Sequence, residues 1–327
     1  RSRTMTDMPF TMEDIRRTGA KKRDAWWTVF VVDPVASPIA LFIANRTRIT
    51  PNQITVASFV LGLGAAVSFA FADYPALVLG AVLYHLSFVL DCVDGKVARL
   101  KDTGSIFGGW LDYILDRVRV FVCAVALMGG QFVKTGRPIY LYLAVFVVFL
   151  EMLRNLNALR VNAEREAMLT GIRQAIADSA PPGGSSGQLG ALPPATQEAV
   201  RRLAVDDIDP DVELADRRPD PAEVIQQRFQ AKFGPYTRFR DFLQTRRVRT
   251  HIISGIEFQM ATFIIGPLTS IIPVVVITGA LLLVFEFAII YKLWLSSRDY
   301  ERIIQQIRAA PAAVQGPLPP AAPGRRP

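Results

Sequence analysis

Apolar runs long enough to cross a membrane recur along this 327-residue sequence, in which 51% of the residues are hydrophobic. A water-soluble domain of this length does not need so many long apolar segments. Inside a bilayer the backbone polar groups must be paired within the chain, so the runs predict helices. The sequence therefore predicts an all-α, polytopic membrane protein with six transmembrane helices. The expected spans, in order, are 54–72, 76–91, 106–128, 139–154, 252–268 and 271–294.

Polar stretches divide the chain into five expected parts. In order these are an N-terminal cytosolic and interfacial segment (1–49), transmembrane helices 1–4 (50–160), a partly disordered polar cytosolic insertion (161–250), transmembrane helices 5–6 (251–297) and a mostly disordered cytosolic tail (298–327). In the first part the apolar runs 25–30 and 38–43 are each too short to span, and they predict an interfacial amphipathic helix. Within the insertion, a Pro-, Gly- and Ser-rich middle predicts a linker, and 198–203 and 221–233 predict short helices.

The distribution of basic residues predicts the orientation in the membrane. The formal net charge is +8, and nearly all Lys and Arg near the spans lie in the segments expected on one side. The opposite loops carry only Lys134 and Arg137. The positive-inside rule therefore predicts that both termini and the acidic motif face the cytosol. We expect a multi-pass protein of a prokaryotic plasma membrane. No base-reading module is present in the sequence, so we expect lipid and not nucleic acid as the partner of this positive charge.

Four aspartates gather at the junction of the second and third expected spans. Asp91 and Asp94 are three residues apart, and Asp112 and Asp116 are four apart, so on helices each pair projects from one face. Carboxylates at a membrane edge are costly unless something binds them. Two such pairs facing each other across a turn would form a four-carboxylate cage. A cage of this kind suits hard divalent cations such as Mg²⁺ or Mn²⁺.

The aspartates belong to a longer pattern, Asp-x2-Asp-Gly-x2-Ala-Arg-x8-Gly-x3-Asp-x3-Asp, which runs from Asp91 to Asp116 without a gap. This pattern resembles the signature of the CDP-alcohol phosphotransferase (CDP-alcohol phosphatidyltransferase) family, membrane enzymes of phospholipid biosynthesis that release CMP. The resemblance extends to the Thr-Pro-Asn entry of the first span, the interfacial N-terminal helix and the six spans. It does not cover 162–250 or the tail. It implies a transferase of substituted phosphate groups that acts as a homodimer.

The resemblance also implies roles for the matched residues. Two Mg²⁺ or Mn²⁺ ions would be held by Asp91, Asp94, Asp112 and Asp116 and would clamp the pyrophosphate of a CDP-linked donor. Asp116 is the expected general base, which takes the proton of the acceptor hydroxyl. The candidates for donor binding are Thr50, Asn52, Gly95, Arg99 and Gly108. Two alternatives stay open for Arg99, which either neutralises phosphate or braces an aspartate, and Thr50 is also simply a good helix start.

Polar residues beyond the motif are expected to define the acceptor. Arg119 follows Asp116 by three residues, which places it on the aspartate face one turn deeper. In phosphatidylinositol phosphate synthases, basic residues near the end of the fourth span bind the acceptor's phosphate, which makes Arg154 and Arg160 candidates. The Lys-x-Arg pair of that family is not reproduced here, so an inositol phosphate acceptor stays open. Glu257 is a further acceptor candidate, with pairing to a buried arginine as the alternative.

The leading hypothesis is Mg²⁺-dependent transfer of a phosphatidyl group from CDP-diacylglycerol to the hydroxyl of a polar alcohol, with release of CMP. An alternative is the same chemistry with a soluble CDP-polyol donor, as in di-inositol phosphate synthases. More distant alternatives are a polyprenyl transferase, which uses two separated aspartate motifs, and an ion-coupled transporter, which predicts internal repeats or broken helices. The acids of this chain cluster in one motif at one membrane edge, which favours the first hypothesis.

Overall fold

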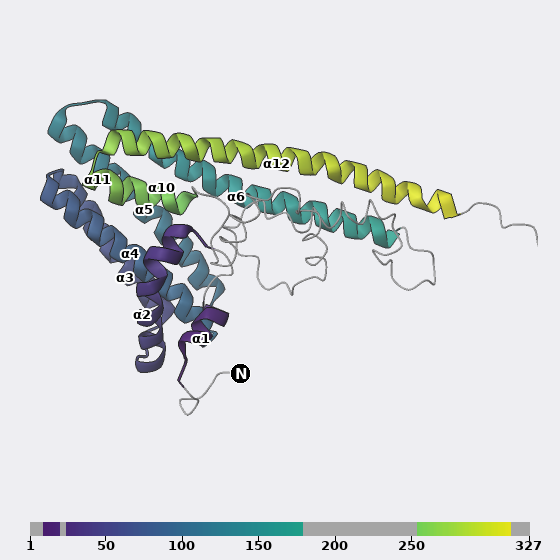
Figure 1. The fold of residues 1–327 in the computed structure, drawn as a ribbon, viewed down its shortest axis with the longest axis horizontal. Helices are drawn as coiled ribbons and strands as arrows, with labels where there is room; N and C mark the ends of the chain where they lie inside the picture. The colour runs from purple at the N-terminus through teal and green to yellow at the C-terminus, as the bar shows by residue number, and fades with distance from the viewer. Residues whose placement is uncertain (1–8, 20–23, 179–253, 315–327) are drawn as a thin grey trace, which may run out of the picture. The chain divides into compact units, whose positions relative to one another are not determined.

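The computed structural model describes residues 9–19, 24–178 and 254–314, and its elements are labelled in Figure 1. The chain divides into two compact units. The first comprises Arg1–Asn155 and Gln227–Glu286, and the second comprises Leu156–Gln226 and Phe287–Pro327. The linker and the two short helices expected within the insertion lie outside the described residues.

Helical turns begin the first unit. They are α1 (Met12–Asp14), η1 (Ile15–Gly19), η2 (Thr28–Val32) and α2 (Asp33–Arg46). Most of the two apolar runs lies in one helical stretch, Thr28–Arg46, with Pro34 in the first turn of α2 and Pro38 within the helix. This stretch has 19 residues and is long and apolar enough to cross a membrane by length and composition. Each run alone is too short to span, but the continuous helix is not, and its interfacial position stays a prediction.

Three long helices follow and carry the aspartate motif. They are α3 (Pro51–Phe71), α4 (Tyr74–Lys101) and α5 (Ile106–Thr135). α4 ends at Asp102, which adopts a left-handed conformation with φ 51°, and α5 starts at Ser105, whose hydroxyl accepts the backbone N–H of Gly108 at 2.9 Å. The short turn between these two caps brings the end of α4 next to the start of α5, and with them the two halves of the motif.

The remaining elements are α6 (Ile139–Asp178), α10 (Gly255–Met260), η5 (Ala261–Ile265), α11 (Gly266–Leu268) and α12 (Ile271–Val314). Two of these helices are longer than expected. α6 does not end near Arg154 but continues into the part expected to be a polar insertion. α12 does not end near Trp294 but continues into the part expected to be a mostly disordered tail. Loss of hydropathy marks the end of an apolar span, but it does not end a helix whose next residues are also good helix formers.

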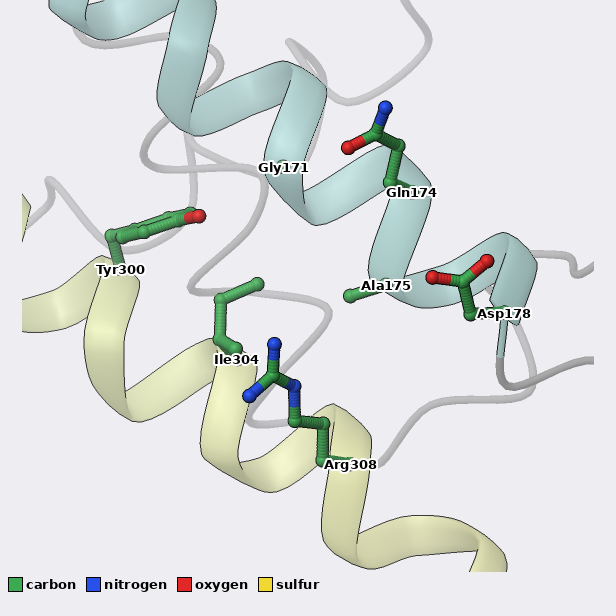
Figure 2. Close-up of a pocket in the computed structure, with 7 residues that line it drawn as sticks. All are labelled: Gly171, Gln174, Ala175, Asp178, Tyr300, Ile304 and Arg308. Carbon is green, nitrogen blue, oxygen red and sulfur yellow. The ribbon is translucent and has the colours of Figure 1, made fainter.

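Apolar packing in the second unit accounts for the extra length of these helices. A small buried cluster joins α6 to α12 through side chains spaced three or four residues apart; its members are Leu169, Ile172, Ile303 and Ile307. A cavity of about 390 Å³ lies beside this cluster (Figure 2). Its lining residues are Gly171, Gln174, Ala175, Asp178, Tyr300, Ile304 and Arg308. The second unit is therefore a helix pair with an apolar seam of its own.

Five stretches of the described residues are long and apolar enough to cross a membrane, by length and composition. They are Thr28–Arg46, Pro51–Phe71, Tyr74–Lys101, Ile139–Ile172 and Ile271–Arg308. The last four correspond to expected spans, whereas the first lies in the segment expected to be interfacial. α5 and the path from α10 to α11, both expected to span, are not among the five. An all-α, polytopic membrane architecture is thus confirmed, and the count of six spans is not.

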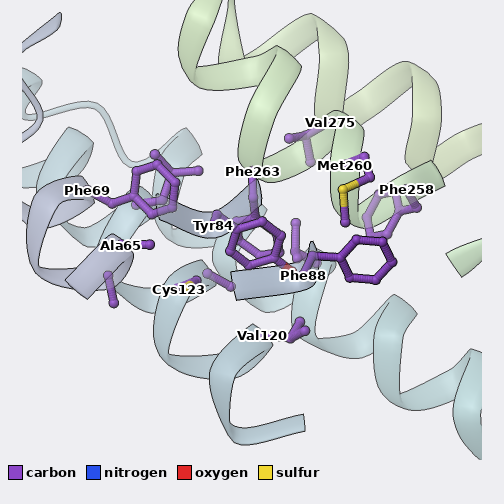
Figure 3. Packing of buried hydrophobic residues seen from close by; sticks show 14 of the residues in the cluster. Ala65, Phe69, Tyr84, Phe88, Val120, Cys123, Phe258, Met260, Phe263 and Val275 are labelled. Carbon is purple, nitrogen blue, oxygen red and sulfur yellow. The ribbon is translucent and has the colours of Figure 1, made fainter. Parts of the chain in front are cut away.

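The apolar core of the first unit joins buried side chains of α3, α4, α5, α10, η5 and α12 (Figure 3). The ring of Phe263 from η5 lies 6.4 Å from that of Phe69 in α3 and 4.6 Å from that of Tyr84 in α4, measured between centroids. Gly80 permits the close approach of α3 and α4, because a Cβ at this position would lie 2.5 Å from the ring of Phe69. This tight packing fixes α3 and α4, which together with α5 carry the polar site.

Candidate active site

A narrow crevice between α3, α4 and α5 contains three of the four motif aspartates. Asp91 enters it from α4, and Asp112 and Asp116 enter it from α5. The other residues that line the crevice are Thr55, Ser58, Phe59, Leu115 and Arg119. The structure thus brings the two halves of the motif to one place, as the spacing of the aspartates predicts.

Asp94, the fourth aspartate, lies beside this crevice and is buried, with 4% of its surface exposed. The hydroxyl of Thr55 donates a 2.6 Å hydrogen bond to its Oδ2. Asp91 and Asp112 are close enough to act on Asp94 through charge repulsion. The hydrogen bond from Thr55 offsets part of the free-energy cost of holding a buried carboxylate near two other acids. Sequence reasoning missed Thr55, although a hydroxyl residue in the second turn of an apolar span was the available signal.

Asp116 is held between two guanidinium groups. Arg119 donates from Nη2 to its Oδ1, and Arg117 donates from Nη2 to its Oδ2. Arg117 also lies 4.0 Å from Oε2 of Glu151, measured from Nη1, and that oxygen accepts a 3.0 Å hydrogen bond from Gln259. The proposed base is therefore connected, through Arg117, to side chains of α6 and α10.

Arg119 is buried on the aspartate face, with 2% of its side chain exposed. Its Nη1 donates to the hydroxyls of Ser58 and Ser87, both at 3.1 Å, and to Oδ1 of Asp91 at 3.3 Å. Its stem fills the space left by Gly62, where a Cβ would lie 2.5 Å from Cδ of Arg119. The sequence placed Arg119 correctly on this face, but the contacts shown are with two serines and two aspartates, and acceptor binding stays a prediction.

Gly108 at the start of α5 and Asn52 at the start of α3, two of the candidates for donor binding, lie next to each other. A Cβ added to Gly108 would lie 2.7 Å from Oδ1 of Asn52, so this glycine leaves room for the amide at the start of α3. Thr50 caps α3, since its hydroxyl accepts from the backbone N–H of Gln53 at 3.4 Å and its own N–H donates to Oε1 of Gln53 at 3.0 Å. Of the two alternatives for Thr50, the helix start is the one that the contacts show.

Gly95 and Arg99 also lie side by side, one turn apart on α4. A Cβ at Gly95 would lie 3.3 Å from Nη1 of Arg99. The Nε and Nη2 groups of Arg99 donate to the carbonyl oxygen of Gly19, at 3.0 and 2.9 Å. The motif arginine thus fastens the N-terminal element η1 to α4, a contact that neither of its two expected roles includes.

Arg154 and Arg160, two of the acceptor candidates, both belong to α6. Arg154 is buried, and its Nε lies 3.9 Å from Oε1 of Glu286. Its guanidinium packs against the backbone of α10, because a Cβ at Gly255 would lie 2.4 Å from Nη1. Arg160 is exposed and belongs to the second unit. For Arg154 the structure therefore shows pairing with an acid, the alternative to an open pocket.

Glu257 is buried and acts as a cap. Its Oε2 accepts the backbone N–H of Ser254 at 2.9 Å, which forms part of a capping box at the start of α10. Its Oε1 accepts the N–H of Trp26 at 3.1 Å. Both carboxylate oxygens thus stabilise the backbone, and acceptor binding by Glu257 stays a prediction.

The crevice offers carboxylate oxygens, the ligands that Mg²⁺ and Mn²⁺ prefer. Within residues 9–19, 24–178 and 254–314, however, no three His, Cys, Asp or Glu side chains are grouped so that they could hold a metal ion. Asp91 and Asp116 instead share the guanidinium of Arg119. The residues therefore fit a hard divalent cation by their chemistry, while an arginine sets the arrangement that the structure shows.

Comparison with known proteins agrees with this geometry. Residues 48–191 match the family model described as CDP-alcohol phosphatidyltransferase. The match covers 144 of the 327 residues. The matched region begins just before α3 and includes all four aspartates of the motif.

Curated relatives resemble the chain over parts of their length. It is 36% identical to "Bifunctional IPC transferase and DIPP synthase" of Thermococcus kodakarensis over 101 residues, which cover 31% of this chain and 22% of the relative. It is 35% identical to "Phosphatidylinositol phosphate synthase" of Corynebacterium glutamicum over 88 residues, 27% of this chain and 37% of the relative. It is 32% identical to "CDP-diacylglycerol--serine O-phosphatidyltransferase" of Helicobacter pylori over 109 residues, 32% of this chain and 44% of the relative. The chain spans less than half the length of each of these relatives.

Proposed function

We propose that this protein transfers a phosphatidyl group from a CDP-linked lipid donor to the hydroxyl of a polar alcohol, releasing CMP at the cytosolic face of the membrane. The observation that carries the proposal is the crevice, in which Asp91, Asp112 and Asp116 converge from α4 and α5 within the region that matches the family model. The three relatives are named as an IPC transferase and DIPP synthase, a phosphatidylinositol phosphate synthase and a CDP-diacylglycerol–serine phosphatidyltransferase. These names support the reaction class, and they leave the identity of the acceptor open.

Asp116 is the proposed general base. The acceptor oxygen attacks the β-phosphorus, the proton of its hydroxyl passes to Asp116, and the bond from that phosphorus to the bridging oxygen breaks, so that CMP leaves with the bonding electrons. Each oxygen of a carboxylate can accept two hydrogen bonds, and each oxygen of Asp116 receives one from an arginine. A lone pair therefore remains on each oxygen, and Arg117 orients the carboxylate for the acceptor hydroxyl.

Three of the four motif aspartates line the crevice and Asp94 lies beside it, so we expect their charge to be offset before a pyrophosphate binds there. Mg²⁺ or Mn²⁺, two ions held by Asp91, Asp94, Asp112 and Asp116, would supply this neutralisation. Thr55 fixes the orientation of Asp94 through its 2.6 Å hydrogen bond. The chain's own residues thus orient a ligand oxygen before the cation binds.

The outer surface of α5 supports a lipid donor. The helix that carries Asp112 and Asp116 exposes Ile106, Phe107 and Trp110, which are 96%, 61% and 57% accessible. Such side chains are suited to contact with acyl chains and not with water. A second candidate is the same transfer from a soluble CDP-polyol, which the name of the Thermococcus relative as a DIPP synthase favours.

The test is an assay of CMP release by the purified protein with Mg²⁺, labelled CDP-diacylglycerol or a soluble CDP-polyol, and a panel of alcohols. We expect CMP with the lipid donor, loss of turnover in EDTA and recovery with Mn²⁺. Asp116→Asn should lower the rate by about 10²–10⁴-fold, the usual contribution of a general base. The matched control is Asp102→Asn, at the left-handed C-cap of α4, a conformation that Asn tolerates well. Absence of CMP with every donor and acceptor would refute the proposal.

A further inference from the structure

Arg119 is the one member of the crevice lining that brings a positive charge to it. It touches Asp91 from α4 and Asp116 from its own helix. We propose that Arg119 is an internal counter-cation, a positioning residue that holds these two carboxylates in the cation-free protein and that a divalent cation must displace from them. The inference rests on the proposed function, because it assumes that the crevice is where the cation binds.

The first argument is the cost of burying charge. Arg119, Asp116 and Asp91 have 2%, 16% and 22% of their side chains exposed. A buried carboxylate without a partner is strongly destabilising, so a cluster of acids prepared for a cation needs another positive charge when that cation is absent. Arg119 supplies this charge at the positions of two proposed ligands.

The second argument is that one of the two terminal nitrogens of Arg119, Nη1, has neutral contacts to fall back on. Nη1 carries two hydrogens, and three acceptors lie around it, the hydroxyls of Ser58 and Ser87 and one oxygen of Asp91. If a cation takes Asp91, both hydrogens of Nη1 still have a hydroxyl to bind. These two serines are buried, with 1% and 0% exposed, and each also donates to a backbone carbonyl of the other helix, so they form a fixed platform.

The third argument is that the stem of Arg119 has a dedicated space. The position opposite it on α3 is Gly62, where any Cβ would overlap the stem at 2.5 Å. The side chain can thus stay in place along α3 while its guanidinium exchanges one set of acceptors for another. Arg117 lacks this setting, since its side chain is 31% exposed and its second acid is Glu151, outside the crevice lining.

The inference predicts that Arg119 weakens cation binding when no donor is present. The measurement is Mn²⁺ binding to the purified protein in detergent, followed by electron paramagnetic resonance of the free ion. We expect Arg119→Gln to bind Mn²⁺ at least tenfold more tightly than the wild type, because a like charge a few ångströms from the ion is removed from a poorly screened site. Arg119→Lys, which keeps the charge, should bind Mn²⁺ nearly as weakly as the wild type. The matched control Arg117→Gln should change the affinity less, because solvent screens that side chain.

Thermal unfolding provides the second measurement and covers the risk that Arg119→Gln does not fold. This variant is purified in Mn²⁺ and then treated with EDTA, and we expect a larger fall in its melting temperature than in that of the wild type. A variant that is unfolded even in Mn²⁺ would overturn the inference, because the cation then cannot replace the arginine. Equal Mn²⁺ affinity in wild type and Arg119→Gln would also overturn it.

The outcomes separate this inference from the proposed function. Equal Mn²⁺ affinities together with CMP release would refute only the role of Arg119. A clear difference in Mn²⁺ affinity without CMP release from any donor would support the role of Arg119 and refute the transfer reaction. If Mn²⁺ binds neither the wild type nor any variant, both fail.

Discussion

Replacing Thr55 by Val tests whether the buried contact to Asp94 organises the crevice. The two side chains have nearly the same shape, so the change removes a hydroxyl without opening a cavity. The lost interaction is a 2.6 Å hydrogen bond to a carboxylate that is 4% exposed. Hydrogen bonds to charged groups contribute about 1.5–3 kcal/mol, and about 1.4 kcal/mol corresponds to a factor of ten. We therefore expect kcat/KM for CMP release to fall by about 10- to 100-fold if the whole effect acts on the position of Asp94.

The assay is initial-rate CMP release at saturating Mg²⁺ with the donor varied, together with thermal unfolding of the same samples. Thr55→Ser is the matched control, because it keeps the hydroxyl and loses only a methyl group. It should retain most of the activity, while Thr55→Val loses both activity and stability. The reasoning is refuted if Thr55→Val and Thr55→Ser have the same kcat/KM and the same melting temperature, since the hydroxyl would then not hold Asp94.

Three further changes test neighbouring parts of the site. Gly108→Ala should lower the rate of CMP release about tenfold or more, because its Cβ would lie 2.7 Å from Oδ1 of Asn52. The control Gly109→Ala, whose Cβ would have no atom within 4 Å, should stay within about twofold of wild type. Equal rates for the two variants would count against crowding at Gly108. Glu257→Gln should lower the melting temperature through loss of about 1 kcal/mol of capping, and a raised KM for the acceptor instead would indicate a pocket role. Arg99→Ala should accelerate hydrogen exchange at residues 12–19, measured by mass spectrometry, and unchanged protection would show that its contact to η1 is dispensable.

The motif shows how far a sequence can predict a site like this one. Spacing on a single helix is a local property. Once the two helices are predicted, Asp91 and Asp94 must share one helix face, and so must Asp112 and Asp116. The short turn between α4 and α5 then leaves few ways to arrange the two pairs. The same periodicity placed Arg119 on the aspartate face. All of these predictions depend only on residues that are close in sequence.

Contacts between distant segments could not be predicted in the same way. Ser58 and Ser87 bind Arg119 from two other helices, and nothing in their local sequence distinguishes them from other small polar residues of an apolar span. The contact from Arg99 to the carbonyl of Gly19 joins positions 80 residues apart. Hydropathy also underestimated α6 and α12, because their continuation depends on an apolar seam in the second unit.

The space at Gly62 has a consequence for related sequences. A side chain at this position and a long side chain at position 119 exclude each other, because they would occupy the same volume between α3 and α5. The two positions, 57 residues apart, should therefore change together during divergence: homologues with alanine or serine at 62 should have a short residue at 119. Glycine at the first position would then identify, from sequence alone, the relatives that can accommodate a buried arginine beside the aspartates.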